Sequence, residues 1–188
     1  MIPSMPLSHF PQLEHMQPLS WDEAFAIWHS NEAHNPSWQQ LVRERGFDSW
    51  EEWRMTYATP LALPSRSWHL YRIHNPLQVV PTFQGGPFKT WIARYYGGIS
   101  QPPFSKIVQH PQILANPSIN SLFSSFPTKT TIMGLQQSEV ITIIEGMHRC
   151  CALALAAQRN IHIETELYIA LADATNETLP EIGQVTNV

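Results

Sequence analysis

The sequence contains few cysteines, few basic residues and no long apolar run. Only two of its 188 residues are cysteines, Cys150 and Cys151, and they are adjacent. Neighbouring cysteines very rarely bridge each other, so a disulfide framework is excluded and the usage fits a reducing compartment. No apolar run approaches the roughly 20 residues of a membrane span, and the first residues lack a secretory signal. We therefore expect a cytoplasmic protein with no membrane partner.

Positive charge is also scarce. The chain has 11 basic and 15 acidic residues, a formal net charge of -4, and no run of lysines or arginines. A protein that holds DNA through its phosphates usually concentrates positive charge on one face. The composition therefore argues against nucleic acid as a partner, although a local basic patch can still form in the fold.

Apolar and aromatic residues, by contrast, are abundant. Hydrophobic residues make up 43% of the chain, with seven tryptophans, five tyrosines and eight phenylalanines. This is ample for a core that needs neither disulfides nor a structural metal. The length fits one domain with an extension. We expect an N-terminal arm and helical extension over residues 1–64, a domain over 65–175 and a polar tail over 176–188.

The N-terminal third predicts an irregular arm followed by helices. Residues 1–19 carry four prolines and no clear periodicity. Residues 20–58 have the spacing of three short helices, the first of which opens with a capping box of Ser20 and Glu23. Five of the seven tryptophans lie in this helical part. Such a stripe can be a ligand box or a partner surface, but burial in the core is the favoured interpretation.

The rest of the chain mixes strand and helix patterns. Runs with period-two alternation or many β-branched residues indicate strands, and runs with apolar residues at helical spacing indicate helices. The final strand pattern alternates apolar and polar residues and predicts a half-buried strand. Strands are expected over 68–73, 130–135, 139–145 and 161–171, and helices over 88–96, 104–110, 118–126 and 147–159.

The junction between the strand at 139–145 and the helix at 147–159 is the best candidate site. Gly146 has no Cβ, so the backbone can turn sharply and let a ligand approach. The first amides of the helix lack intrahelical partners, and together with the helix dipole they favour an anion. The dipole disfavours basic side chains in the first turn, so His148 and Arg149 make sense if a negative ligand binds there.

Glu145 ends the strand beside these groups and can act as a base, a metal ligand or the ion-pair partner of Arg149. In the last case the pair is structural and His148 only caps or packs, because charged pairs at element ends are common. The helix is apolar on every side, which predicts burial. Cys150 and Cys151 are then core residues, the alternative being a thiolate activated by the helix end.

The residues I-I-E-G-M-H-R-C-C-A-L-A-L-A, followed by a strand, resemble the G-x-H-R or D-G-H-H-R turn of the ParB/sulfiredoxin-like superfamily. That superfamily includes partition proteins that bind nucleotide, sulfiredoxin, free-serine kinases and ParB-like nucleases. The resemblance covers residues 68–172 and is specific over 139–172, whereas residues 1–60 fall outside it. It implies an α+β domain in which helices pack on a small mixed sheet.

In these relatives the turn and the helix after it bind nucleotide phosphates. The resemblance therefore implies phosphate-binding roles for Gly146, Met147, His148 and Arg149, and for Lys89, which resembles a lysine near the phosphates of some members. Glu145 stands where kinase-like members have an acidic residue, and we take Glu145 and His148 as the catalytic candidates. The implied cofactor is ATP or another nucleotide, with Mg²⁺ as its companion ion.

Two differences between this sequence and the superfamily argue against two of the superfamily's functions. Sulfiredoxin has a reactive cysteine between the glycine and the histidine, and a thioether at Met147 cannot replace it. No helix-turn-helix of the partition proteins follows the motif. The leading hypothesis is a nucleotide- or phosphate-binding protein that acts as a small-molecule phosphotransferase. The alternatives are a non-catalytic, nucleotide-binding regulatory module and a nuclease. A closed small pocket would favour the phosphotransferase, and a basic groove beside residues 145–149 would favour the nuclease.

The nine histidines do not predict a metal site. They are scattered along the chain, and the closest ligand-like pair, His162 and Glu164, would share one face of a strand. A metal site needs three or four converging ligands, so a solvated polar face is the favoured interpretation of this pair. We expect a small-molecule or nucleotide ligand and no protein-bound metal.

Overall fold

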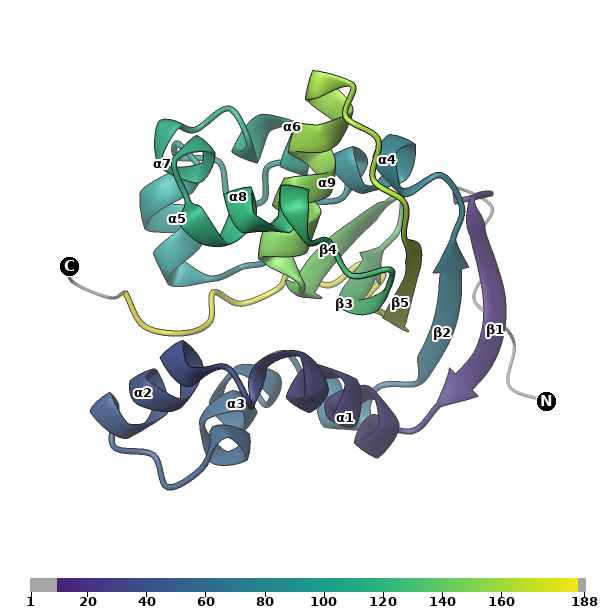
Figure 1. The fold of residues 1–188 in the computed structure, drawn as a ribbon. Helices are drawn as coiled ribbons and strands as arrows, with labels where there is room; N and C mark the ends of the chain where they lie inside the picture. The colour runs from purple at the N-terminus through teal and green to yellow at the C-terminus, as the bar shows by residue number, and fades with distance from the viewer. Residues whose placement is uncertain (1–9, 186–188) are drawn as a thin grey trace.

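The computed structural model describes residues 10–185, which form one mixed sheet covered by helices on both faces (Figure 1). The strands are β1 (Leu13–Leu19), β2 (Trp68–Ile73), β3 (Lys129–Gln137), β4 (Val140–Glu145) and β5 (Glu166–Asp173). Their order across the sheet is β1-β2-β5-β3-β4. The β5 and β3 strands are parallel, and every other neighbouring pair is antiparallel. The expected α+β class is confirmed.

Two helical layers enclose this sheet. The N-terminal layer consists of α1 (Trp21–Glu32), α2 (Pro36–Glu44), α3 (Trp50–Ala58) and the short 3-10 helix η1 (Leu63–Ser65). The opposite layer consists of α4 (Pro76–Val79), η2 (Val80–Thr82), α5 (Lys89–Tyr95), α6 (Phe104–Ile107), α7 (Pro111–Leu114), α8 (Pro117–Ser124) and α9 (Met147–Arg159). Figure 1 shows the first layer below the sheet and the second above it.

Each layer has its own hydrophobic core because side chains alternate across a strand. On β3, Ile132 packs into the core around α9, and its neighbour Met133 packs into the core with the tryptophans of α1 and α3. The predicted tryptophan burial holds for Trp28, Trp50 and Trp53, which are at most 5% exposed. None of the helices within residues 10–185 is long and apolar enough to cross a bilayer.

The prolines of the N-terminal arm predicted an irregular segment, and this prediction is wrong. Residues Leu13–Leu19 add β1 to the edge of the sheet, where they pair with β2. An edge strand tolerates Pro18 because only one side of its backbone needs hydrogen bonds. Phe10 and Leu13 are buried in the core of the α9 layer. The expected extension over 1–64 is thus tied to the sheet by its first strand, and residues 1–9 lie outside the described part.

Two expectations for the C-terminal third need correction. The last strand begins at Glu166 rather than at residue 161, and it is central, between β2 and β3. Because both faces of a central strand are covered, Ala170 and Ala172 are buried on the face that was expected to be polar. A half-buried strand is therefore wrong.

The expected polar tail over 176–188 is also anchored, at least as far as residue 185. Ile182 is 2% exposed, and its amide donates to the carbonyl of Pro87 at 2.8 Å. The amide of Lys89 donates back to the carbonyl of Ile182 at 3.0 Å. Figure 1 shows this segment passing between the N-terminal helices and α5. Buried apolar residues explain the anchoring, which the polar composition concealed.

The β1–β2 pair contains a histidine couple that should respond to pH. Nε2 of His15 lies 3.1 Å from Nδ1 of His69, which is 7% exposed. Burial, and then the neighbouring His15, lower the pKa of His69 below its usual 6.5. The unfolded chain therefore binds more protons than the folded chain as pH falls below 6.5, so the folded state loses stability there.

We expect the free energy of unfolding in urea to fall between about pH 7.5 and about pH 5.5, the range in which histidine titrates. The loss should be smaller in His69→Gln, which has no imidazole to protonate. Equal losses in the two proteins would mean that His69 carries no part of the pH dependence.

Candidate functional site

The turn between β4 and α9 has the geometry expected of residues 145–149. Gly146 has φ +98°, a conformation that residues with a side chain rarely adopt. A Cβ on Gly146 would also lie 2.4 Å from Cγ2 of Ile132. The glycine is therefore required twice, by the backbone angle and by the close approach of β3.

The first amides of α9 have no acceptor among the described residues. The amide of Cys150 donates to the carbonyl of Gly146 at 2.9 Å and starts the helical pattern. The amides of Met147, His148 and Arg149 precede it and have no hydrogen bond to the rest of the described chain. The helix behind them is rigid, since the side chains of residues 150–156 are buried. A fixed set of donors with the positive end of a helix dipole favours an anion.

The guanidinium of Arg149 is largely used within the protein. Its Nη2 pairs with Oε1 of Glu145, and its Nη1 donates to the hydroxyl of Thr130 and, at 3.2 Å, to the carbonyl of Thr131. The side chain is 12% exposed. This arrangement corresponds to the alternative in which Arg149 pairs structurally with Glu145. Arg149 ties α9 to β3 and to the end of β4.

Glu145 is the most buried acid of the site, with a side chain that is 4% exposed. Arg149 binds one carboxylate oxygen, and Nδ2 of Asn31 on α1 donates to the other at 2.9 Å. Burial raises the pKa of Glu145, Arg149 opposes this rise, and Glu32 adds to it. With both oxygens engaged, Glu145 is poorly placed to take a proton from a ligand or to bind a metal.

His148 is the titratable group that remains free at this turn. Its ring lies 5.6 Å from the ring of Trp91, and its nitrogens have no hydrogen-bond partner among the described residues. Burial, and then the nearby Arg149, lower the pKa of His148 below its usual value. The lowered pKa favours the neutral imidazole, whose nitrogens can donate or accept a hydrogen bond with a ligand.

A cavity of about 390 Å³ opens directly in front of α9. Gly146, Met147, His148 and Arg149 line it, so four of the five expected phosphate-binding residues meet at one wall. Lys89 does not line it, although its neighbours Phe88 and Thr90 do. Its volume lies within the roughly 300–1,000 Å³ typical of small-molecule sites.

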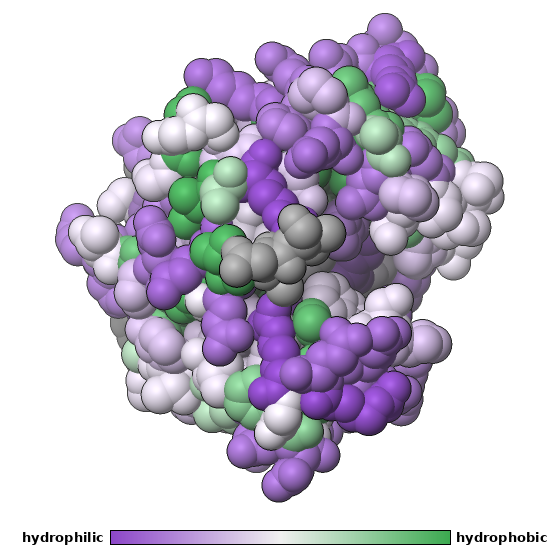
Figure 2. All heavy atoms as spheres, turned by 90° about the vertical axis from the view of Figure 1, so that its left-hand side faces the viewer, coloured by the Kyte–Doolittle hydropathy of each residue, from purple (hydrophilic) through white to green (hydrophobic). Residues whose placement is uncertain are grey.

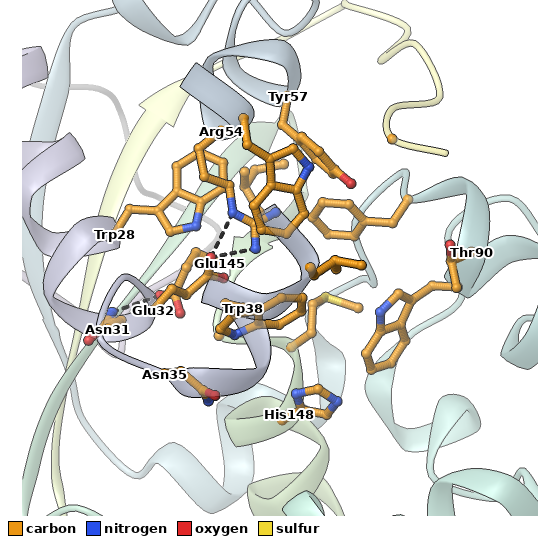
Figure 3. A pocket seen from close by; sticks show the side chains of 18 of the residues that line it. Trp28, Asn31, Glu32, Asn35, Trp38, Arg54, Tyr57, Thr90, Glu145 and His148 are labelled. Carbon is orange, nitrogen blue, oxygen red and sulfur yellow. Dashed lines mark hydrogen bonds and ion pairs between the residues drawn. The ribbon is translucent and has the colours of Figure 1, made fainter. Parts of the chain in front are cut away.

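The other walls come from segments that the sequence did not assign to a site. The N-terminal helices contribute the aromatic residues Trp28, Trp38, Trp53 and Tyr57, and α5 with the residue before it contributes Trp91 and Phe88. Figure 3 shows Arg54 and Tyr57 at one end of the cavity and His148 at the other. Core burial was the favoured interpretation of these tryptophans, and Trp28 and Trp53 are both buried and part of the cavity wall. The ligand-box alternative stays a prediction.

The guanidinium of Arg54 lies among the aromatic rings that the N-terminal helices contribute to the cavity. Its guanidinium carbon lies 3.9 Å from the centroid of Trp53 and 5.1 Å from that of Trp38. Nε of Arg54 donates to Glu32 at 2.7 Å, so the buried charge is compensated. Cation–π contacts of this kind hold the rings in place. The tryptophan spacing indicated such a cluster, but its position across from residues 145–149 depends on the tertiary fold.

The cysteines take no part in the site, and among the described histidines His148 alone lines the cavity. Cys150 and Cys151 are fully buried, and burial raises the pKa of both thiols. They are core residues, and the activated-thiolate alternative is wrong. Within residues 10–185, no three side chains of the ligand-forming types converge to hold a metal ion.

We expect Gly146→Ala to lower the free energy of unfolding by about 2–5 kcal/mol, the sum of a left-handed backbone and an overpacked contact. Gly97 is the matched control, because it also has a positive φ but open space around it. Gly97→Ala should cost only about 1–2 kcal/mol. Equal costs, measured by urea unfolding, would show that Ile132 moves aside.

Arg149→Met should lower the free energy of unfolding by about 3–5 kcal/mol, because it leaves the Glu145 carboxylate buried without its charged partner. Arg43 on the exposed face of α2 is the control, and Arg43→Met should change stability by less than about 0.5 kcal/mol. An Arg149→Met protein with unchanged stability and lost anion binding would instead make Arg149 a ligand-binding residue.

Comparison with known proteins gives no relative from which a function can be inferred. No family model matches this chain, and no curated protein or solved structure is significantly similar to it.

Proposed function

We propose that this protein binds a small phosphate-bearing molecule, with a nucleotide as the leading candidate, in the cavity in front of α9. The observation that carries the proposal is the position of this cavity. It places three amides without acceptors, the imidazole of His148 and the positive end of a buried helix at the wall of a space of about 390 Å³. Phosphate is a common ligand of such helix ends.

The charges around the cavity also favour an anion. Three arginines line it, and two of them pair with the acids Glu32 and Glu145. The third, Arg45, donates to the hydroxyl of Tyr57 at 3.1 Å and has no carboxylate partner in the part of the chain that the structure describes. One positive charge of the lining is thus left over, so the cavity as a whole favours an anionic ligand.

The mixed sheet and the glycine turn after β4 are what the resemblance to the ParB/sulfiredoxin-like superfamily implies. They support the assignment, and with it a phosphotransferase. His148 is then the better general base, because both carboxylate oxygens of Glu145 already have donors. A Mg²⁺ ion would be held by the phosphates of the ligand, whose charge it neutralises during transfer.

The alternatives are weaker on specific grounds. A nuclease needs an extended basic groove, whereas the cavity is small and has aromatic walls. Figure 2 shows hydrophilic side chains over most of the face that carries the C-terminal segment, with apolar ones scattered among them. A non-catalytic regulatory module would use the same site without turnover, so it is separated by an activity assay with a bound nucleotide.

Thermal unfolding in the presence of nucleotides, with and without Mg²⁺, tests the proposal. A ligand at a hundred times its Kd stabilises the folded state by about 2.7 kcal/mol, which raises the Tm measurably. We expect a shift with at least one nucleotide or sugar phosphate. A complete panel without any shift would contradict the proposal.

His148→Ala should weaken phosphate-ligand binding by roughly twofold to tenfold, the worth of one hydrogen bond. The Tm without ligand should change little, since the ring nitrogens have no hydrogen-bond partner in the described chain and only the contact with Trp91 is lost. His162→Ala, at an exposed position, is the control and should bind as the unaltered protein does. Unchanged binding in His148→Ala, measured by calorimetry, would remove His148 from the site.

A further inference from the structure

Two tryptophans stand apart from the others because they are only partly buried where they line the cavity. Trp38 comes from α2 and Trp91 from α5. The other tryptophans of the cavity wall, Trp28 and Trp53, are 1% exposed and pack fully into the core. Leaving large aromatic faces toward a cavity is unfavourable unless something covers them.

The two side chains belong to different layers of the molecule. Trp38 packs at the margin of the core under the N-terminal helices, 5.7 Å from the ring of Trp53. Trp91 packs at the margin of the α9 core, where Tyr95 and His148 contact its ring at 5.1 and 5.6 Å. In Figure 3, Trp38 lies on one side of the cavity, and Thr90, the neighbour of Trp91, lies on the opposite side.

The cavity exists because the sheet ends at this point. The edge strand β4 finishes at Ile144 and Glu145, and both residues line the cavity. Beyond that edge no described strand separates the two helical layers, so their aromatic margins face a common space. Phe88 packs against both cores and closes one side of this space.

We propose that Trp38 and Trp91 form a stacking subsite for a flat aromatic or heteroaromatic ring, so that the ligand combines such a ring with an anionic group. This inference rests on the proposed function, because the amides of α9 would hold the phosphate of the same molecule. The N-terminal helices thereby supply one wall of the ring subsite through Trp38, and α5 supplies the other through Trp91. A flat ring fits because both indoles are partly exposed at the cavity wall, and stacking on an indole accepts any planar ring.

A ring subsite also explains the polar groups at its margin. Glu32 lines the cavity, and Arg54 binds only one of its carboxylate oxygens. The other oxygen can accept a hydrogen bond from an amino or hydroxyl group on the ligand. The uncompensated Arg45 lies at the end of the cavity that contains Tyr57. These groups would select among flat rings by their substituents.

Three ligands separate the subsite from the phosphate site. We would measure calorimetric affinities of the purified full chain for nucleoside monophosphates of each common base, for the corresponding nucleosides and for ribose 5-phosphate. The monophosphate of at least one base should bind more tightly than ribose 5-phosphate by roughly fivefold to 150-fold, the contribution of one stacked base.

Trp38→Ala should remove most of this advantage and leave the affinity for ribose 5-phosphate unchanged, and Trp38→Phe should restore part of it. Trp21 is the matched control, because it is also partly buried in the N-terminal layer but does not line the cavity. Trp21→Ala should retain the preference for the ring. The Tm of each variant without ligand reports any loss of stability separately.

The possible results have different meanings. Equal affinities for ribose 5-phosphate and for every monophosphate would overturn the stacking subsite and leave the phosphate site standing. Nucleosides that bind as tightly as their monophosphates, with a loss in Trp38→Ala, would support the subsite and overturn the phosphate site. No binding by any of the three ligand types would overturn both.

Discussion

The buried contact between Glu145 and Arg149 is the interaction on which the site depends. Arg149 joins α9 to β3 and β4, and Asn31 extends the network to α1 through the second oxygen of Glu145 and, at 2.9 Å, through the carbonyl of Thr131. Four elements from two parts of the chain are thereby fixed around one carboxylate. A buried carboxylate is costly unless it is paired and hydrogen-bonded, and here Arg149 pairs with one oxygen while Asn31 donates to the other.

Because of this network, the residues of the turn have two different roles. Because Arg149 and Glu145 satisfy each other, they position the helix, while the amides of the first turn and His148 face the cavity. The positive end of α9 is held rigidly by a helix that is buried on nearly all sides. A binding site built this way loses little conformational entropy when its ligand arrives, since its donors are already ordered.

The cavity itself is a product of the layered architecture. Helices pack on both faces of the sheet, and where β4 ends at the edge the two layers meet without a strand between them. The C-terminal segment adds Ile182 and Gly183 to the wall, and its hydrogen bonds to the start of α5 keep it there. Two short regions without a motif of their own, α2 and the last described residues, therefore shape the space that a ligand would enter.

The sequence by itself determined the local structure around the turn. The β-branched run before Gly146, the apolar helix over 147–159 and the capping box at Ser20 are short-range signals, and the structure has a strand, a helix and a helix start at these places. Periodicity and capping depend on neighbours in the chain, so they can be read without the fold. The sequence also predicted that the turn would carry free amides.

Only the tertiary structure decided what those residues face. The prolines of the N-terminal arm argued against a strand there. The strand forms because β2 has a free edge with which it can pair. The central position of β5 overrode its alternating pattern, because a second helical layer covers its other face. Likewise, the pairing of Glu145 with Asn31, the distance of Lys89 from the cavity wall and the meeting of Trp38 with residues 145–149 depend on contacts between segments far apart in the sequence. Long-range packing decides such contacts, and no local pattern encodes them.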